Sequence, residues 1–359
     1  MKILIVLPTD SLGGAENYLK MMALHYKNEE VDVYAFKNES NHQWDDLKQY
    51  SNLQFLSKSH VFIGVIKFCF LMLLRRKKYD YIFTSQVYVN GLVGILKLLG
   101  VIKSKYFVAR ESTSIFLRFK GKKLKYYRAV INLGYRNMDL LICQTKEMKQ
   151  QFIHHFDKIE QRTKICVIPN PIDLEVSNKL SKSVLDFDIS LEYIVSAGRF
   201  IPLKGYYVLI ASFYKLKKKY PNLKLILLGE GELLQDYKMQ VENLELEDSV
   251  IFPGFTNNVY PYFKHATVCV VSSRIEGFPN VLLQMMSQNT KVVSTTCTET
   301  IKEIKGVFTC KADSEVLLTN AINKCLKTNT IVNRNIFDNY LNVRTITSFM
   351  KIVDANLNV

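Results

Sequence analysis

Residues 272–287 read SSRIEGFPNVLLQMMS and join a short apolar segment to a predicted helix. The apolar residues 268–271 are typical of a buried strand, and the helix is expected over 280–287. Pro279 suits the first helical turn, where a missing N–H is tolerated. In an open α/β sheet, ligands bind at the carboxyl ends of strands, and helix N-termini attract anions. The stretch therefore predicts an α/β fold with a ligand site at this loop.

Strand and helix character alternates along the rest of the chain in two series, over residues 2–168 and 193–310. Strands separated by helix-length segments specify doubly wound parallel sheets. We therefore predict two Rossmann-like domains facing a cleft, which is the default ligand site. The predicted parts are an N-terminal domain 1–173, a linker 174–190, a C-terminal domain 191–335 and a C-terminal helix 336–359 that packs back across the cleft. A helix over 42–50 is also expected.

The positive charge of the chain is unevenly distributed. The chain carries a net charge of +15, and residues 1–173 contain 27 Lys and Arg against 15 Asp and Glu, whereas the remainder contains 21 against 18. The basic half is therefore expected to meet an anionic partner, and nucleic acid or membrane phospholipid would satisfy the charge. A nucleic-acid binder is disfavoured because no nucleic-acid recognition motif accompanies the positive charge.

Two segments of this basic half mix cations with apolar or aromatic residues, namely the run 61–78 and the stretch 118–128. The apolar part of the first, 61–74, is too short for a transmembrane helix. Cations near an anionic bilayer and interfacial tyrosines both favour membrane binding, whereas the alternative is a solvated helix face. The predicted membrane-facing residues are Arg75, Arg76, Lys77, Lys78, Lys120, Lys122, Lys123 and Lys125.

The seven cysteines show neither paired nor metal-ligand spacing, and no cleavable signal is expected before Met1. We expect buried thiols in a reducing cytoplasm and no metal site.

Loops with glycines and charges follow several predicted strands. Gly13 and Gly14 follow the first strand, and Gly229 and Gly254 follow two strands of the second series; each is either a ligand loop or a tight turn. After another strand, Gly198-Arg199 precede Lys204-Gly205. Two cations at a strand-to-helix turn form a diphosphate cradle, unless the loop is simply solvated.

The opening stretch contains two further candidates, Glu276 and Gln284. Glu276 can bind a sugar hydroxyl or stabilise a cationic transition state, and its alternative role is to cap the following helix. The Gln284 amide can bind a ribose diol or lie on the helix surface. No spacing of Ser, Cys, His and Asp indicates a hydrolytic nucleophile.

Taken in order, these motifs resemble the retaining glycosyltransferases of family 4, which have the two-domain GT-B architecture. The resemblance implies sugar transfer from a nucleotide-diphosphate donor with retention of configuration and without a metal cofactor. It implies that 1–173 binds the acceptor and 191–335 the nucleotide sugar. The catalytic residues implied are Arg199, Lys204 and Glu276. The donor-binding residues implied are Gly13, Gly14, Gly198, Gly229, Gly254, Gly277, Phe278, Pro279, Asn280 and Gln284.

The chain departs from the family pattern at two places. The family usually has a second Glu where this chain has Gln284, and many members have a sugar-binding His whose nearest counterpart here is Arg110-Glu111. An amide still offers a donor and an acceptor to ribose hydroxyls, so altered nucleotide binding is expected. Glu16, Arg110 and Glu111 are predicted to contact the acceptor or the donor sugar.

The resulting hypothesis is a hexosyltransferase-like enzyme, peripheral on the cytoplasmic face of an anionic inner membrane. Its acceptor would be lipid-linked or a growing saccharide in bacterial surface polysaccharide biosynthesis, such as lipopolysaccharide O-antigen, capsule or exopolysaccharide. Two alternatives are a sugar-nucleotide epimerase-like enzyme on the same fold and a donor-binding subunit with weakened catalysis.

Overall fold

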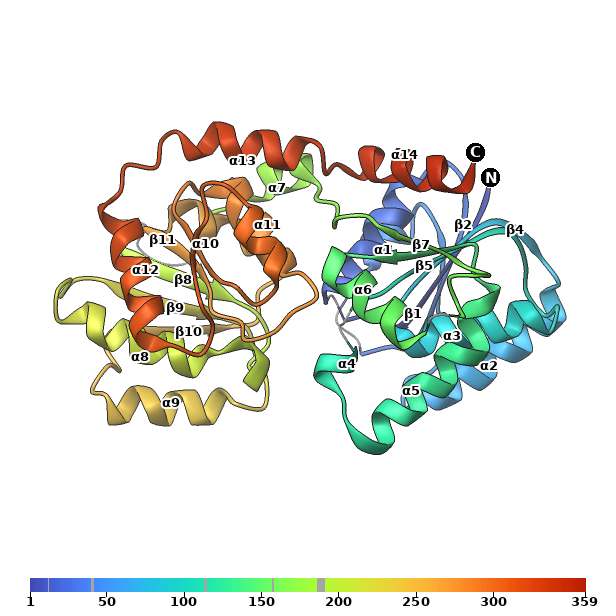
Figure 1. The fold of residues 1–359 in the computed structure, drawn as a ribbon, viewed down its shortest axis with the longest axis horizontal. Coiled ribbons are helices and arrows are strands. Elements are labelled where there is room, and N and C mark those ends of the chain that lie inside the picture. The colour runs from blue at the N-terminus through green and yellow to red at the C-terminus, as the bar shows by residue number, and fades with distance from the viewer. Residues whose placement is uncertain (12, 40–41, 113–114, 157, 186–190) are drawn as a thin grey trace. The chain divides into compact units, whose positions relative to one another are not determined.

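A computed structural model describes residues 1–11, 13–39, 42–112, 115–156, 158–185 and 191–359. The chain folds into a first compact unit, Met1–Pro171 with Ile346–Val359, and a second compact unit, Ile172–Thr345. Each unit contains one parallel sheet flanked by helices (Figure 1). The fold class predicted from strand and helix alternation, two Rossmann-like α/β domains, is confirmed.

The first unit is built on a sheet of seven strands in the order β3-β2-β1-β4-β5-β6-β7, all parallel. Its strands are β1 (Lys2–Thr9), β2 (Glu30–Lys37), β3 (Asn52–Phe55), β4 (Lys78–Ser85), β5 (Lys103–Arg110), β6 (Leu140–Cys143) and β7 (Lys164–Val167). The central strands are buried on both faces, which explains their continuous apolar runs.

Side chains alternate between the two faces of this sheet. Leu4 and Val6 pack with the helices of one face, α2 (Val61–Arg75), α3 (Val87–Leu98), α5 (Gly121–Gly134) and α6 (Lys146–His155). Ile3 and Ile5 pack with α1 (Gly14–His25) and α14 (Ile346–Leu357) on the other. Three short helices complete the unit: η1 (Asp45–Leu47), α4 (Ile115–Arg118) and η2 (Tyr135–Asn137).

The second unit contains six parallel strands in the order β10-β9-β8-β11-β12-β13. They are β8 (Tyr193–Ala197), β9 (Lys224–Leu228), β10 (Val250–Gly254), β11 (Val268–Val271), β12 (Val292–Thr295) and β13 (Phe308–Cys310). Its helices are α7 (Leu174–Leu180), η3 (Pro202–Lys204), α8 (Tyr206–Lys217), α9 (Leu234–Asn243), α10 (Tyr260–His265), α11 (Asn280–Gln288), η4 (Glu299–Glu303), α12 (Glu315–Lys327) and α13 (Asn333–Asn342).

Three predicted segments differ from the structure. The helix expected over 42–50 is only the short η1, because Trp44 and Leu47 are buried without a continuous apolar face around them. The single helix expected over 336–359 is two: α13 lies in the second unit and α14 packs on α1 in the first. A break at Val343 separates them.

The predicted linker 174–190 also differs. Asp173 caps α7 by accepting a hydrogen bond from the Val176 N–H at 2.9 Å, and α7 packs on α10 and α11 within the second unit. This segment therefore begins the second unit instead of linking the two. Residues 186–190 lie outside the described residues.

Candidate active site

In each sheet the strand order reverses beside the first strand, between β1 and β4 in the first unit and between β8 and β11 in the second. Ligands of doubly wound sheets bind at such points, beyond the carboxyl ends of the strands. Gly13 and Gly14 follow β1, whereas Gly198 follows β8 and Glu276 lies in the loop after β11. The predicted site residues thus lie at the carboxyl edges of the two sheets.

At the carboxyl edge of the second sheet, backbone hydrogen bonds join the loops after β8, β9 and β10. The Gly198 N–H donates to the Leu228 carbonyl at 2.9 Å, and the Gly229 N–H donates to the Gly254 carbonyl at 2.8 Å. Gly229 has a φ of +136°, and a Cβ there would lie 2.0 Å from the Gly198 carbonyl oxygen. Three predicted donor-binding glycines therefore allow the loops to lie against one another without side chains between them.

Two predicted catalytic residues meet directly at this edge. Lys204 Nζ lies 2.7 Å from Glu276 Oε1, although the residues are 72 positions apart. Ser273 Oγ donates to the same carboxylate oxygen at 2.6 Å, and the Glu276 N–H donates to the Cys297 carbonyl at 3.1 Å. The Lys204 and Glu276 side chains are only 19% and 17% exposed, so the ion pair is fixed in position.

The two loops that carry this pair are also joined through their backbones. Ser272 Oγ donates to the Lys204 carbonyl at 2.8 Å, and the Arg274 N–H donates to the Leu203 carbonyl at 2.8 Å. Gly205 has a φ of +65°, and a Cβ there would lie 2.3 Å from the Ser272 carbonyl oxygen. The glycine after Lys204 thus permits the approach that brings Lys204 to Glu276.

Arg199 differs from the other cations of this edge. Its side chain is exposed, and within the described part of the chain no hydrogen bond or ion pair holds its guanidinium. Arg274 on the neighbouring loop is paired, with Nε 2.7 Å from Asp313 Oδ1. Arg199 is therefore available to an anionic ligand.

The remaining residues of the opening stretch lie at the start of α11. Gly277 and Phe278 are half-buried, Pro279 is buried and Asn280 is the first helical residue. Gln284, one turn further along, donates from Nε2 to the Tyr260 hydroxyl at 3.3 Å. Its amide is therefore half-buried between α11 and α10 and retains an oxygen for a further contact.

The carboxyl edge of the first sheet is instead filled by a buried polar network. Arg110 is 1% exposed, and its Nη2 donates to Asn170 Oδ1 and its Nη1 to Ser85 Oγ. Its guanidinium carbon lies 4.7 Å from the centre of the Tyr18 ring. Burial lowers the pKa of Arg110 to about 10, so the side chain remains a cation at neutral pH.

Glu111 belongs to the same network. Its carboxylate accepts hydrogen bonds from the Tyr135 hydroxyl and from Asn90 Nδ2, and its carbonyl accepts one from Gln144 Nε2 at 2.8 Å. Burial raises the pKa of the Glu111 carboxyl to about 7, against the opposing effect of those bonds. Arg110 and Glu111, predicted to contact a sugar, are thus held by protein groups, and that predicted contact stays untested.

Glu16 lies above the β1 loop, where a Cβ on Gly13 would be 2.6 Å from Glu16 Oε2. The side chain is buried, and its carboxylate accepts a hydrogen bond from Gln86 Nε2. Gln86 follows β4 and has a φ of +102°, which is unusual for a residue with a side chain. The two residues join the β1 and β4 loops at the point where the strand order reverses.

Sequence reasoning misses most members of the first-unit network: Ser85, Gln86, Asn90, Tyr135, Gln144 and Asn170. They come from four parts of the chain, 85–90, 135, 144 and 170, and none forms a local motif with Arg110 or Glu111. The one available signal is Asn170 between two prolines, a pattern that by itself predicts only a turn.

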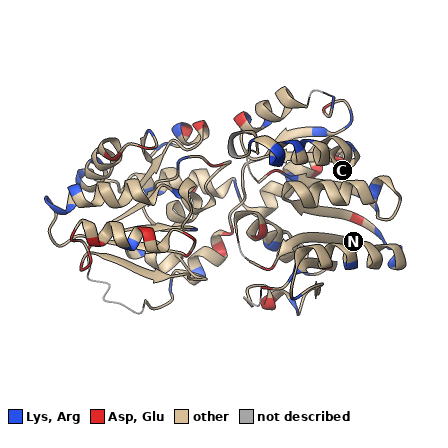
Figure 2. Cartoon of the chain, turned by 90° about the horizontal axis from the view of Figure 1, so that it is seen from below, with Lys and Arg blue, Asp and Glu red and all other residues tan. Residues whose placement is uncertain are grey.

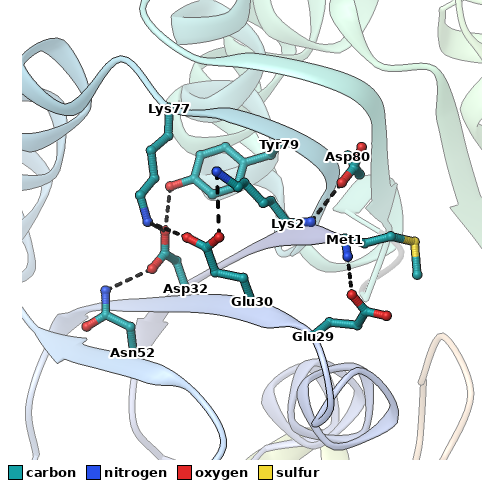
Figure 3. Close-up of polar contacts among 9 residues, drawn as sticks. All are labelled: Met1, Lys2, Glu29, Glu30, Asp32, Asn52, Lys77, Tyr79 and Asp80. Carbon is teal, nitrogen blue, oxygen red and sulfur yellow. Dashed lines mark hydrogen bonds and ion pairs between the residues drawn. The ribbon is translucent and has the colours of Figure 1, made fainter.

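The predicted membrane-facing residues are mostly exposed, with one exception. Lys77 Nζ lies 2.9 Å from Glu30 Oε1 and 3.0 Å from Asp32 Oδ2, in a network at the amino edge of the sheet (Figure 3). Burial opposes ionisation of Asp32, but hydrogen bonds from Asn52, Lys77 and Tyr79 outweigh it and lower its pKa. Lys77 is thus already paired with two carboxylates, and its membrane contact stays a prediction.

The other predicted cations lie at exposed positions, and Figure 2 marks the charged residues on the chain. They are Arg75, Arg76, Lys78, Lys120, Lys122, Lys123 and Lys125.

Among the described residues, no group of three or more His, Cys, Asp or Glu side chains is arranged to hold a metal ion. Within the same residues, every helix is too short or too polar to cross a bilayer.

Family sequence models match both units of the chain. The model described as Glycosyltransferase Family 4 matches residues 12–176, and the one described as Glycosyl transferases group 1 matches residues 178–339. The two units, their parallel sheets and the loop motifs at the sheet edges define a GT-B protein. The chain belongs to glycosyltransferase family 4.

Two relatives and one solved structure illustrate the similarity. An uncharacterized glycosyltransferase of Methanocaldococcus jannaschii is 31% identical over 65% of this chain and 60% of its own length. A Campylobacter jejuni relative, N-acetylgalactosamine-N,N'-diacetylbacillosaminyl-diphospho-undecaprenol 4-alpha-N-acetylgalactosaminyltransferase, is 31% identical over 49% of this chain and 47% of its own. The aligned region thus spans less than two thirds of these relatives.

The structure of Anabaena HepE in complex with UDP-glucose superposes with a TM-score of 0.83 at 19% identity, covering 100% of this chain and 99% of that one. This likeness extends over both units and supports the shared fold.

Proposed function

We propose that the chain is a retaining, metal-independent glycosyltransferase that moves a sugar from a nucleotide-diphosphate donor to a lipid-linked or growing saccharide acceptor. Family membership and the loop motifs at the second sheet edge support this proposal. The observation that carries it is the Lys204–Glu276 ion pair, because Lys204 lies on the same strand-to-helix connection as the exposed Arg199.

In the proposed reaction, the bond between the anomeric carbon of the sugar and the β-phosphate oxygen of the donor breaks. Arg199 and Lys204 stabilise the negative charge that develops on that oxygen. An acceptor hydroxyl oxygen bonds to the anomeric carbon on the same face, and its proton passes to the leaving phosphate. Glu276 binds a hydroxyl of the transferred sugar, and the nucleoside diphosphate is released.

The Lys204–Glu276 pair gives this proposal a physical basis. A diphosphate and a carboxylate compete for the same ammonium group, so donor binding would shift Lys204 toward the phosphates. Glu276 would then retain its hydrogen bond from Ser273 while a sugar hydroxyl replaces the ammonium. Gln284 is proposed to bind the ribose with its amide oxygen.

We further propose that the acceptor carries a polyisoprenoid diphosphate and that the enzyme is peripheral on the cytoplasmic face of an anionic membrane. The C. jejuni relative is named for an undecaprenol-linked substrate. The exposed cations of the first unit, such as Lys122 and Lys125, fit the charge of that surface. Bacterial surface polysaccharide assembly is the corresponding proposed pathway.

The test is sugar transfer by Arg199→Ala, with Lys215→Ala as the matched control. Lys215 lies in α8 of the same unit and pairs with Glu315 at the surface, away from the sheet edge. UDP-, GDP- and ADP-sugars are assayed, beginning with UDP because the Anabaena structure holds UDP-glucose. We expect kcat/KM to fall about 100- to 1000-fold in Arg199→Ala and to be unchanged in the control.

The thermal midpoint of both variants should equal that of the wild type, because neither side chain is buried. Full activity of Arg199→Ala would contradict its role at the diphosphate. The anomeric configuration of the product, read by NMR, tests retention separately.

A further inference from the structure

Helix α2 (Val61–Arg75) presents apolar side chains on two opposite faces. Toward the sheet, Gly64, Phe68 and Met72 are buried at a spacing of four residues. A Cβ on Gly64 would lie 1.9 Å from the Phe36 carbonyl oxygen, so the helix lies directly on β2. This face anchors α2 to the first unit, whose helices are labelled in Figure 1.

The outward face of α2 is also apolar. Phe62 is 72% exposed, Phe70 is 60% exposed and Leu74 is 65% exposed. The full set of exposed large apolar side chains on this helix is Phe62, Ile63, Ile66, Phe70, Leu73 and Leu74. These residues recur every three to four positions, so they form one continuous stripe. A stripe of this size on a surface helix indicates an interaction site.

The charges around this stripe identify its partner. Helix α2 contains no Asp or Glu, and its exposed Lys67 lies between the two apolar ends. Arg75 and Arg76 follow the stripe, and Lys58 precedes it, all exposed. A second copy of the chain docking stripe to stripe would bring these cations together, which is unfavourable. An anionic bilayer surface instead satisfies the apolar side chains and the cations at once.

The length of α2 sets how it meets the bilayer. Its 15 residues extend over about 22 Å, less than the roughly 30 Å of a hydrocarbon core. One side of the helix is in addition occupied by β2. The helix can therefore lie along the membrane surface but not cross it.

We propose that α2 inserts its outward stripe into the headgroup region of an anionic membrane and holds the first unit there. The proposal rests on the proposed membrane association, but it assigns the attachment to apolar insertion by α2 instead of to the lysines alone. Lysine-mediated binding weakens as salt screens it, whereas insertion of phenylalanines does not. The two contributions are thus separable.

The direct test uses Phe70→Trp in the full chain. Trp44 is the only native tryptophan and is 1% exposed, so it adds a constant background. Vesicles of phosphatidylglycerol and phosphatidylcholine are added, with or without bromine on the acyl chains near the headgroup. We expect a blue shift and bromine quenching for Phe70→Trp. The matched control is Val332→Trp, at a site in the second unit that is 68% exposed, and should show neither.

A second measurement is vesicle sedimentation of Phe62→Ser/Phe70→Ser against Ile331→Ser/Val332→Ser. The first pair should lower the vesicle partition coefficient at least about tenfold at high salt, and the second pair should leave it unchanged. The free energy of unfolding, measured by Trp44 fluorescence, should be unchanged in both double variants. The rate of sugar transfer to a water-soluble acceptor with a short lipid chain, assayed without detergent, should also be unchanged.

Other outcomes would overturn the proposal. Absence of bromine quenching in Phe70→Trp, or equal partitioning of all variants, would show that α2 stays outside the bilayer. A wild-type dimer that the Phe62→Ser/Phe70→Ser variant dissociates would assign the stripe to a second copy. If the wild type transfers no sugar to the soluble acceptor, the proposed enzymatic function is contradicted. The vesicle measurements would still decide whether α2 inserts into the membrane.

Discussion

The carboxyl edges of the two sheets occupy equivalent positions in two similar units, yet they are built in different ways. The second-unit edge consists of glycine-containing loops joined by backbone hydrogen bonds, with one half-buried ion pair and an exposed arginine. The first-unit edge is closed by buried side chains around Arg110 and Glu111. The second edge leaves an exposed arginine for a ligand, whereas a buried and mostly hydrogen-bonded side-chain network gives the first edge rigidity. Among the described residues, Arg110 Nε is a buried donor of this network without a hydrogen-bond partner. The difference supports the proposal that the second edge binds the charged donor, and it predicts that the first edge is a fixed support.

The largest expected effect is on the support. Arg110→Met removes a fully buried cation together with the hydrogen bonds that it donates to Asn170 Oδ1 and Ser85 Oγ. We expect the free energy of unfolding of the first unit to fall by about 3 to 5 kcal/mol. Urea unfolding followed by Trp44 fluorescence measures it, because Trp44 is buried in that unit. A loss below about 1 kcal/mol would mean that the network is not a support.

The pH dependence of the free energy of unfolding also tests the first-unit network, through Glu111. The Glu111 carboxyl has an ordinary pKa of 4.5, which burial raises to about 7 in the folded protein. Between these values the folded state binds the proton more tightly than the unfolded state. The contribution of Glu111 to stability is therefore full below about pH 4.5 and is lost as the pH rises through 7, by up to about 3 kcal/mol.

Glu111→Gln should remove this contribution, because an amide does not titrate. Trp44-monitored urea unfolding at pH 5 and pH 8 compares the two proteins. The wild type should lose more stability than Glu111→Gln between these pH values, and equal losses would place the titration elsewhere.

The next effect concerns the backbone of the second edge. Gly205→Ala combines a left-handed φ with a Cβ 2.3 Å from the Ser272 carbonyl oxygen. Gly254→Ala has a comparable φ of +86°, but its nearest neighbour is Glu230 Oε1 at 3.7 Å. We expect Gly205→Ala to destabilise by about 2 to 4 kcal/mol and Gly254→Ala by about 1 kcal/mol, in thermal unfolding followed by circular dichroism. Equal losses would show that the close contact between the Lys204 and Ser272 loops is not needed.

The smallest effect is expected from the Lys204–Glu276 pair itself. Lys204→Met, Glu276→Gln and the double variant form a cycle in which the coupling energy should be about 1 kcal/mol without donor, because both side chains are partly exposed. Thermal unfolding gives this energy. A coupling near zero would mean that the pair does not hold the two loops together.

The sequence predicts the second edge better than the first for a physical reason. Gly198-Arg199, Lys204-Gly205 and the loop around Glu276 are local motifs at strand ends, so alternation alone places them on one edge. Alternation does not predict that the Lys204 and Glu276 side chains meet. That contact depends on the packing of Gly205 against Ser272. The partners of Arg110, such as Asn170 and Ser85, come from distant segments that only the folded sheet brings together.

Some elements of the fold can be predicted from the sequence, and others depend on packing. Continuous apolar strands such as β1 and β8 are readable because both their faces are buried. Short elements such as α7 and η1 are not, because a cap at Asp173 or one buried Trp44 decides them. The pattern at the end of the chain predicts one helix, since the break near Val343 follows from the packing of α14 on α1 and not from a glycine or proline.

The most direct test of donor binding by the second edge is calorimetric titration of the wild type, Arg199→Ala and Lys215→Ala with UDP and UMP, which differ only in the β-phosphate. The wild type and Lys215→Ala should prefer UDP, and Arg199→Ala should lose about tenfold to a hundredfold of that preference while binding UMP normally. An undiminished preference for UDP in Arg199→Ala would contradict diphosphate binding by this edge.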